Sequence, residues 1–309
     1  MKIAFFFVQK TIYFTMKSKI IVMASCLFII LMIIFPSVTE LGTKTAIIIW
    51  ANSIIPVLLP FFIFSEFIKR TGDLHKLSPK VYPFIIAFLS GYPMGAKIVG
   101  DFLRSNTVSI SQGKYILSYS LVTGPAFIIF TIGSFIGNTK AAVLVAISHY
   151  ISAFLNKNFY YTTDKYIRQH VISEPNMDYM ENFSISIGSG FKAMATILAY
   201  LMFFTIGINI LEHVGVFSLI ASDTVNAIIK GILEMTLGIN YIGMCDISIK
   251  LKTILASCMV SFGGLSVIGQ SMSMTRNTGI GVKDILEIKL THALIAGIVA
   301  TMLVNNVVL

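Results

Sequence analysis

Ser90-Gly91-Tyr92-Pro93-Met94-Gly95-Ala96-Lys97 interrupts an apolar run that begins near Val81 and resumes through Ile98 to Leu103. Glycine loosens a helical backbone, and proline removes a backbone donor and leaves a carbonyl without its partner. Within a lipid bilayer, such backbone is tolerated only where protein buries it or where it lines a polar cavity. The stretch therefore predicts a broken helix inside a membrane protein.

A second interruption lies near the other end of the chain, at Phe262-Gly263-Gly264-Leu265-Ser266-Val267-Ile268-Gly269-Gln270. Interrupted hydrophobic segments at matching places in two halves are a sequence pointer to a transporter binding site. We therefore predict an all-α, polytopic membrane protein. Its expected architecture is an inverted-topology repeat with two broken or re-entrant helical segments.

The composition agrees with a membrane protein. Of the 309 residues, 56% are apolar and only 12% are charged, whereas about a quarter of a soluble domain is charged. The net charge of +9 comes mostly from short basic segments that flank apolar runs, as the positive-inside rule describes. We therefore expect the lipid bilayer, and no nucleic acid, as a partner.

No sequence pattern for catalysis or metal binding is present. The three cysteines and five histidines are scattered, without the spacing of a disulfide framework or a metal site. A P-loop, a Gly-x-Gly-x-x-Gly loop and a Gly-x-Ser-x-Gly elbow are all missing. We therefore expect no enzyme activity, no cofactor and no metal.

The apolar runs and their basic flanks divide the chain into four parts. Lysines before the first span place the N-terminus in the cytoplasm, and the same rule places the C-terminus on the side of Arg104 and Lys114. Residues 216–250 are expected to form short helices at the outer face or packed on the bundle. The predicted parts are an N-terminal segment and anchor helix (1–45), a first transmembrane repeat (46–156), a cytoplasmic loop (157–190) and a second transmembrane repeat (191–309).

Weak internal similarity supports the repeat. Residues 54–72 align with residues 197–215, and a broken segment follows each, so that Ser90-Gly91 is placed opposite Gly263-Gly264. The basic flanks make the first copy enter from outside and the second from inside. In such folds, the N-termini of half-helices carry partial positive charge and hold carboxylates or phosphates.

The polar and glycine residues of these interruptions, with the break at Thr123-Gly124-Pro125, are the candidate substrate contacts. Close helix packing by small residues is the alternative explanation for the glycines, and a simple kink is the alternative at Thr123-Gly124-Pro125. The predicted substrate-binding residues are Ser90, Gly91, Tyr92, Gly95, Lys97, Thr123, Gly124, Gly263, Gly264, Ser266 and Gln270.

Three carboxylates are candidates for gating or coupling. A charge at membrane depth is costly and usually faces a cavity or a partner. Asp101, one turn after Lys97, is the expected partner of that lysine, either in a site or as a plain ion pair between successive turns. Glu66 is expected either to pair with Lys69 or Arg70 or to act as a gate. Glu234, in the 216–250 segment, is the third candidate.

Several motifs together resemble the YlbJ-type sporulation integral membrane proteins, which belong to a wider group with a "Gate" (nucleoside-recognition) domain. The resemblance runs in order from about residue 46 to 300. It implies a mother-cell protein in the outer forespore membrane of a spore-forming bacterium, which moves dipicolinic acid toward the forespore. The motifs are Leu59–Glu66, Ser90–Lys97, Thr123–Ile128, Gly231–Thr236 and Ser261–Ser266.

The expected function is therefore secondary-type transport of a small organic anion, with dipicolinic acid as the implied substrate. Two half-helix termini and Lys97 would match its two carboxylates, and Tyr92 would stack on its ring. A Gate-domain transporter of nucleosides or another metabolite is the first alternative. A non-transporting membrane assembly factor, with sporulation membrane partners or as a homo-oligomer, is the second.

Overall fold

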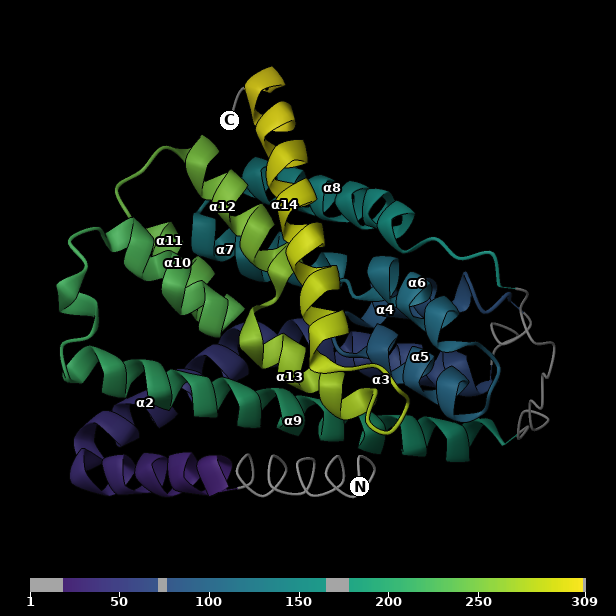
Figure 1. Cartoon of the computed structure of the whole chain (residues 1–309), viewed down its shortest axis with the longest axis horizontal. Helices are drawn as coiled ribbons and strands as arrows, with labels where there is room; N and C mark the ends of the chain where they lie inside the picture. The colour runs from purple at the N-terminus through teal and green to yellow at the C-terminus, as the bar shows by residue number, and fades with distance from the viewer. Residues whose placement is uncertain (1–18, 72–76, 165–177, 308–309) are drawn as a thin grey trace, which may run out of the picture.

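The computed structural model describes residues 19–71, 77–164 and 178–307 and is all-α over these ranges, without a strand (Figure 1). Residues 1–18 of the predicted N-terminal segment and residues 165–177 of the predicted loop lie outside the described residues. Among the described residues, four helical segments are long and apolar enough to cross a membrane: Pro36–Ile68, Tyr179–His213, Ile249–Met274 and Val282–Asn306. The predicted polytopic membrane fold is confirmed.

The chain enters through two antiparallel helical segments. An apolar helix over Lys19–Ile34 leads at Pro36 into a rod formed by α2 (Pro36–Ile49), the π-helical turn η1 (Trp50–Ile54) and α3 (Ile55–Thr71). This rod begins ten residues before residue 46, the predicted start of the first transmembrane repeat. It packs along α9 (Tyr179–His213). The indole Nε1 of Trp50 donates to the carbonyl oxygen of Met194 in the middle of α9, at 2.9 Å.

The first predicted break is a helical hairpin. Helix α4 (Tyr82–Ser90) ends at Gly91, and α5 (Met94–Arg104) begins three residues later and packs back on α4. Gly91 has a φ of 80°, a backbone conformation that an L side chain rarely adopts. The glycine therefore allows the chain to reverse inside the protein.

The next helix is interrupted where the sequence predicted. Helix α6 (Ile110–Ser120) begins with a capping box made by Ser109 and Gln112 and ends before Thr123-Gly124-Pro125. The chain continues through η3 (Phe127–Ile132) and α7 (Gly133–Ile136), and then α8 (Thr139–Asn156) and η4 (Lys157–Tyr160).

The second part of the chain starts with α9, which begins before the predicted end of the polar loop. It is followed by η5 (Phe217–Leu219), a second hairpin of α10 (Asp223–Leu233) and α11 (Met235–Met244), the broken helix α12 (Ile249–Phe262) with α13 (Gly264–Met274), and α14 (Val282–Asn306). Met235, Leu237 and Ile239 of α11 are buried. The 216–250 segment is thus packed into the bundle.

A fixed separation relates the elements of the two parts. His149 in α8 and His292 in α14 are 143 residues apart, and their rings stack with centroids 4.8 Å apart. When residue numbers are shifted by this separation, α3 corresponds to α9, α4–α5 to α10–α11, and α6 to α12. Contacts repeat accordingly, since α5 packs on α13 as α11 packs on α7, and α8 packs on α12 as α14 packs on α6.

This register corrects the pairing of the two breaks. The sequence comparison aligned residues 54–72 with 197–215, which has the separation of 143 seen in the structure. It then placed Gly91 opposite Gly263. In the structure, Gly91 is the tip of the α4–α5 hairpin, and the equivalent position in the second part is Glu234, the tip of the α10–α11 hairpin. Gly263 instead lies between α12 and α13, which together form one crossing segment. The interruptions therefore number four in the described chain: two hairpin tips and two breaks in crossing helices.

The C-terminus also differs from expectation. Lys114 pairs with Asp284 at 2.6 Å, and Arg104 donates to the carbonyl oxygen of Arg276 at 3.3 Å. The start of α14, rather than its end, therefore lies beside the residues predicted to be cytoplasmic, and α14 runs away from them. The reason is that α12–α13 crosses the bundle once instead of turning back.

Candidate functional site

The four interruptions meet at one cavity, which we call the central cavity. Each hairpin tip and each broken crossing helix contributes to it, together with one isoleucine from each long helix. Its volume is about 50 Å³, which is room for a few water molecules and much less than a typical ligand pocket of roughly 300–1,000 Å³. The lining residues are Ile54, Tyr92, Thr123, Phe127, Ile197, Glu234, Met235, Thr236, Val267 and Gln270.

Close backbone contacts hold each hairpin tip against a broken helix. A Cβ on Gly91 would lie 2.8 Å from the backbone nitrogen of Gly124, and a Cβ on Gly264 would lie 3.0 Å from that of Met235. Both glycines have a positive φ, 80° and 75°. These glycines thus allow backbone to approach backbone, and the two contacts occur at equivalent junctions of the two parts.

Three backbone groups freed by the break after α6 have side-chain partners. Pro125 has no N–H, so the carbonyl of Leu121 lacks its helical donor. It accepts instead from the Nζ of Lys289 at 3.1 Å. The N–H of Thr123 donates to Nε2 of His149 at 3.2 Å, and its carbonyl accepts from the Tyr150 hydroxyl at 2.8 Å. Side chains of α8 and α14 therefore stabilise the backbone of the break.

Lys289 is the charged centre beneath the first hairpin tip. It is 1% exposed, and its Nζ also donates to the Tyr92 hydroxyl and lies 4.4 Å from the centre of the Tyr92 ring. That hydroxyl in turn donates to the Val260 carbonyl oxygen at 3.2 Å. Tyr92 is thus held by an ammonium on one side and by the last turn of α12 on the other, with its ring on the central cavity.

Glu234 is the charged group of the second hairpin tip. It caps α11 by accepting from the N–H of Leu237 at 2.8 Å, and it accepts from the Ser266 hydroxyl at 3.3 Å. It is 4% exposed and pairs with no basic side chain in the described chain. The central cavity therefore has a buried carboxylate in its wall.

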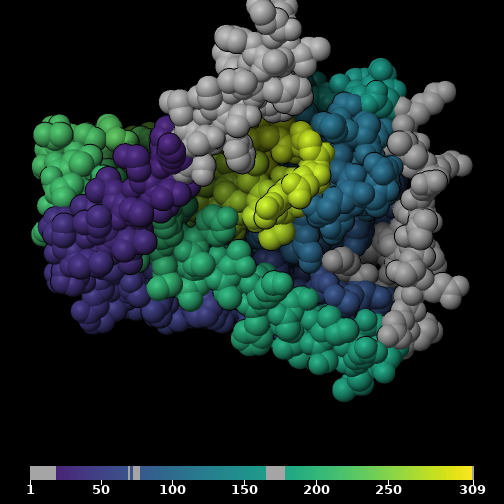
Figure 2. All heavy atoms as spheres, turned by 60° about the horizontal axis from the view of Figure 1, so that its bottom comes forward, coloured from purple at the N-terminus to yellow at the C-terminus, as the bar shows by residue number. Residues whose placement is uncertain are grey.

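A larger cavity of about 290 Å³, which we call the vestibule, lies on the other side of the first hairpin tip. It adjoins the central cavity, because Pro93, Thr196 and Met274 line the vestibule while their neighbours in the chain or helix turn line the central cavity. In Figure 2 the yellow-green segment that ends α13 lies between green α9 and the blue surface of α5 and α6. The lining residues are Phe62, Glu66, Pro93, Met94, Lys97, Ser189, Gly190, Lys192, Ala193, Thr196 and Met274.

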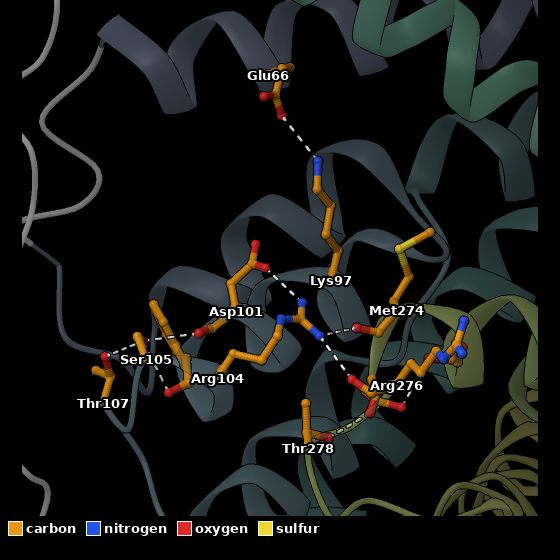
Figure 3. Close-up of polar contacts among 12 residues, drawn as sticks. Glu66, Lys97, Asp101, Arg104, Ser105, Thr107, Met274, Arg276 and Thr278 are labelled. Atoms are coloured by element: carbon orange, nitrogen blue, oxygen red, sulfur yellow. Dashed lines mark hydrogen bonds and ion pairs between the residues drawn. The ribbon is translucent and has the colours of Figure 1, made fainter.

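The charged residues of the vestibule come from three helices. Lys97 extends toward Glu66, and its Nζ lies 4.0 Å from Oε2 of that carboxylate (Figure 3). Glu66 also accepts from Nε of Arg70 at 3.1 Å. Pairing with Lys69 or Arg70 is one of the two alternatives that the sequence predicts for Glu66. Lys192 adds a second lysine to the lining.

Asp101 does not join these groups. Its carboxylate pairs with Arg104 at 2.7 Å, and Arg104 donates to the carbonyl oxygens of Met274 and Arg276 (Figure 3). The expected pairing of Asp101 with Lys97 is therefore replaced by a clamp between α5 and the segment after α13. One helical turn separates the two residues, but Lys97 faces α3 across the vestibule.

The other predicted residues support the tips from behind. Ser90 is buried and donates to the Ser65 hydroxyl at 2.6 Å. A Cβ on Gly95 would overlap the Ser120 carbonyl oxygen, and one on Gly263 would lie 3.5 Å from the Lys289 side chain. Of the predicted substrate contacts, Tyr92, Thr123 and Gln270 line the central cavity and Lys97 lines the vestibule.

Sequence reasoning missed the residues that complete the breaks. His149, Tyr150 and His292 lie within apolar helices, and single histidines carry little signal. Lys289 had a usable signal, because a lysine within the final apolar span is costly at membrane depth. It was overlooked because it follows other charged residues at the start of that span, where an interfacial position is the ordinary explanation.

Comparison with known proteins agrees with the motif resemblance. The chain is 20% identical to the sporulation integral membrane protein YlbJ of Bacillus subtilis (strain 168) over 318 aligned residues, which cover 87% of this chain and 78% of that protein. The chain is a relative of the YlbJ-type proteins. No family model matches the chain, and no solved structure matches it significantly.

Proposed function

We propose that the protein is a secondary transporter whose substrate passes through the vestibule and the central cavity. The observation that carries this proposal is the convergence of four interrupted segments on one cavity, whose mainly apolar lining includes Glu234, Gln270 and two threonines. Irregular backbone at membrane depth is the arrangement in which transporters bind substrates between broken helices. The two parts related by 143 residues, within the predicted repeats 46–156 and 191–309, would then be an inverted-topology repeat.

The vestibule supports an anion as substrate. Lys97 and Lys192 line it, and the Nζ of Lys97 lies 4.0 Å from Oε2 of Glu66. Basic side chains around a low-dielectric opening raise the local concentration of anions. Tyr92 precedes Pro93 of the vestibule lining and presents its ring to the central cavity, where the ring of an aromatic anion that moves inward would reach it.

Glu234 supports a proton as the coupling ion. An anion in the central cavity would lie beside this buried carboxylate, and two like charges at close range in a low dielectric repel strongly. We infer that the carboxyl group takes up a proton when the anion enters. One proton would then accompany each anion, and Glu234 would act as the coupling residue.

The relative in Bacillus subtilis is a sporulation integral membrane protein by name, and we propose dipicolinic acid as the anion because the motif resemblance implies it. Dipicolinate is a planar aromatic dianion, which fits two lysines followed by a tyrosine ring. On this proposal the protein would lie in the outer forespore membrane of the mother cell and carry the Gate-type arrangement of hairpins.

The direct test is the dipicolinate content of spores that lack this gene, measured together with dipicolinate in the mother cell. The proposal expects low content in the spore with synthesis intact. Uptake of labelled dipicolinate by proteoliposomes containing the purified protein is the second measurement. Normal spore content together with no uptake would overturn the proposal.

Competition in the same proteoliposomes separates the alternatives. If nucleosides compete for uptake and dipicolinate does not, the protein is a Gate-type carrier of another metabolite. If purified protein moves neither, and loss of the gene displaces other sporulation membrane proteins, the assembly-factor alternative holds.

A further inference from the structure

Lys289 is a buried lysine whose Nζ lies at the ends of two half-helices. Its Nζ lies 3.1 Å from the carbonyl oxygen of Leu121, which is the C-cap of α6. Through the Tyr92 hydroxyl it is linked to the Val260 carbonyl in the last turn of α12. Helix C-termini carry partial negative charge and unpaired carbonyls. The ammonium therefore occupies a place with the electrostatics of a cation site.

No carboxylate of the described residues forms an ion pair with this lysine. Its described neighbours are Tyr92, His149 and His292, with the backbone of Leu121 and the position that a Cβ on Gly263 would occupy. Glu234, the buried carboxyl group of the central cavity, bonds to Ser266 and Leu237. A buried charge without an ionic partner is retained where dipoles replace the counter-ion.

The equivalent position in α8, in the first part of the molecule, has no lysine. The position 143 residues before Lys289 is Ala146 in α8, which is buried. Transporters of inverted-repeat architecture hold a coupling Na⁺ with unwound carbonyls and half-helix C-termini. In this chain, carbonyls of that kind already have a cation, which is attached to α14.

We propose that Lys289 is a tethered cation that takes the place of a free alkali ion at the ends of α6 and α12, so that the protein neither binds nor needs Na⁺, K⁺ or Li⁺. The inference rests on the proposed transport function for its uptake measurement alone. Its binding measurement needs only the folded protein.

The binding experiment is the thermal unfolding midpoint of the purified, detergent-solubilised protein in chloride salts of Li⁺, Na⁺, K⁺ and N-methyl-D-glucamine at equal ionic strength. For the wild type we expect one midpoint in all four salts. For Lys289→Ala we expect a lower midpoint that rises by about 5 °C or more in a saturating concentration of the alkali ion that fits the site. Lys252→Ala is the matched control, because Lys252 also donates to a backbone carbonyl, that of Gly243 at 2.6 Å, but is half-exposed.

The outcomes are decisive in both directions. A wild-type midpoint that rises with one alkali ion overturns the proposal, and so does folded Lys289→Ala with the same midpoint in all salts. An alkali-specific rise in Lys289→Ala, absent from Lys252→Ala, supports it. If Lys289→Ala does not fold, Lys289→Ser is measured in its place. If neither variant folds, the unfolding midpoints of the wild type in the four salts are the test.

Dipicolinate uptake adds a functional measurement. We expect wild-type uptake at the same rate with N-methyl-D-glucamine as with Na⁺, and Lys289→Ala uptake that is restored at least about tenfold by the ion that stabilises it. Absence of wild-type uptake in every salt would contradict the proposed function while leaving the midpoint measurement valid. Wild-type uptake that stops without Na⁺ would overturn the tethered cation and leave the transport function standing.

Discussion

Both hairpin tips lie with backbone against the backbone of a broken helix, but their turns and their ionisable groups differ. At the first tip, Gly91 contacts Gly124 and the ammonium of Lys289 lies behind Tyr92. At the second, Gly264 contacts the backbone of Met235 and the carboxylate of Glu234 caps α11. Repetition of the chain course therefore builds the scaffold, and single unmatched residues make one tip cationic and the other acidic.

This difference assigns separate tasks to the two tips. A tethered lysine cannot leave its site, so the first tip is suited to hold Tyr92 and the broken α6 in one arrangement. The carboxyl group of Glu234 can gain and lose a proton where it lines the cavity. The second tip is therefore the one expected to change charge during transport.

The largest expected effect tests the shared backbone. Gly91→Ala and Gly264→Ala each place a Cβ within about 3 Å of backbone at a positive φ. Left-handed strain and overpacking together should lower the free energy of unfolding by about 2–6 kcal/mol. Thermal unfolding in detergent measures this. Gly188→Ala in α9, where nothing lies within 4 Å, is the control and should be neutral or stabilising. Wild-type stability of either variant would show that the tip contacts are not tight.

The next effect separates the tips. Tyr92→Phe removes the hydroxyl that links Lys289 to Val260, and buried groups left without a partner cost about 1–3 kcal/mol. Met235 is the counterpart of Tyr92 at the second tip, and Met235→Leu keeps its volume and should cost less than about 1.5 kcal/mol. Equal losses in the two variants, by chemical or thermal unfolding, would mean that the lysine adds nothing to the first tip.

The acidic tip is tested by transport. Glu234→Gln keeps the shape of a protonated carboxyl group but cannot release a proton, so accumulation of anion driven by a pH gradient should fall by about tenfold or more. Exchange of labelled for unlabelled anion should persist. Ser266→Ala, which removes only one hydrogen bond to Glu234, should retain the response to the gradient. Gradient-driven accumulation by Glu234→Gln at the wild-type level would exclude this residue from coupling.

The smallest effect concerns the vestibule, which adjoins only the first tip. Lys97→Ala removes a partly exposed charge, and such charges contribute about 0.2–1 kcal/mol. We expect KM for the anion to rise two- to fivefold, less at high salt, with little change in kcat. Asn240 lies at the equivalent position of α11, 143 residues later, and Asn240→Ala should leave KM unchanged. A larger effect of Asn240→Ala would place the entry path beside the second tip.

The amino-acid sequence alone determined the membrane class, the helical segments and three of the four interruptions. Hydropathy, prolines and glycines act locally: Pro125 and Gly91 break a helix wherever the chain goes next. The acidic tip escaped notice because Leu233-Glu234-Met235 contains neither glycine nor proline, and its turn is made by an extended backbone at Glu234 with a side-chain cap.

Only the tertiary structure decided which interruptions correspond, and what fills them. Apolar segments align in many registers at similar quality, whereas the stacked pair of His149 and His292 permits one separation. Lys97 and Asp101 are one turn apart in sequence, yet they face different neighbours because α5 lies between α3 and α13. Lys289 bonds to Leu121, 168 residues earlier in the chain. The local sequence shows that a proline leaves a carbonyl oxygen without its helical donor. Which side chain donates to that oxygen depends on how the helices pack.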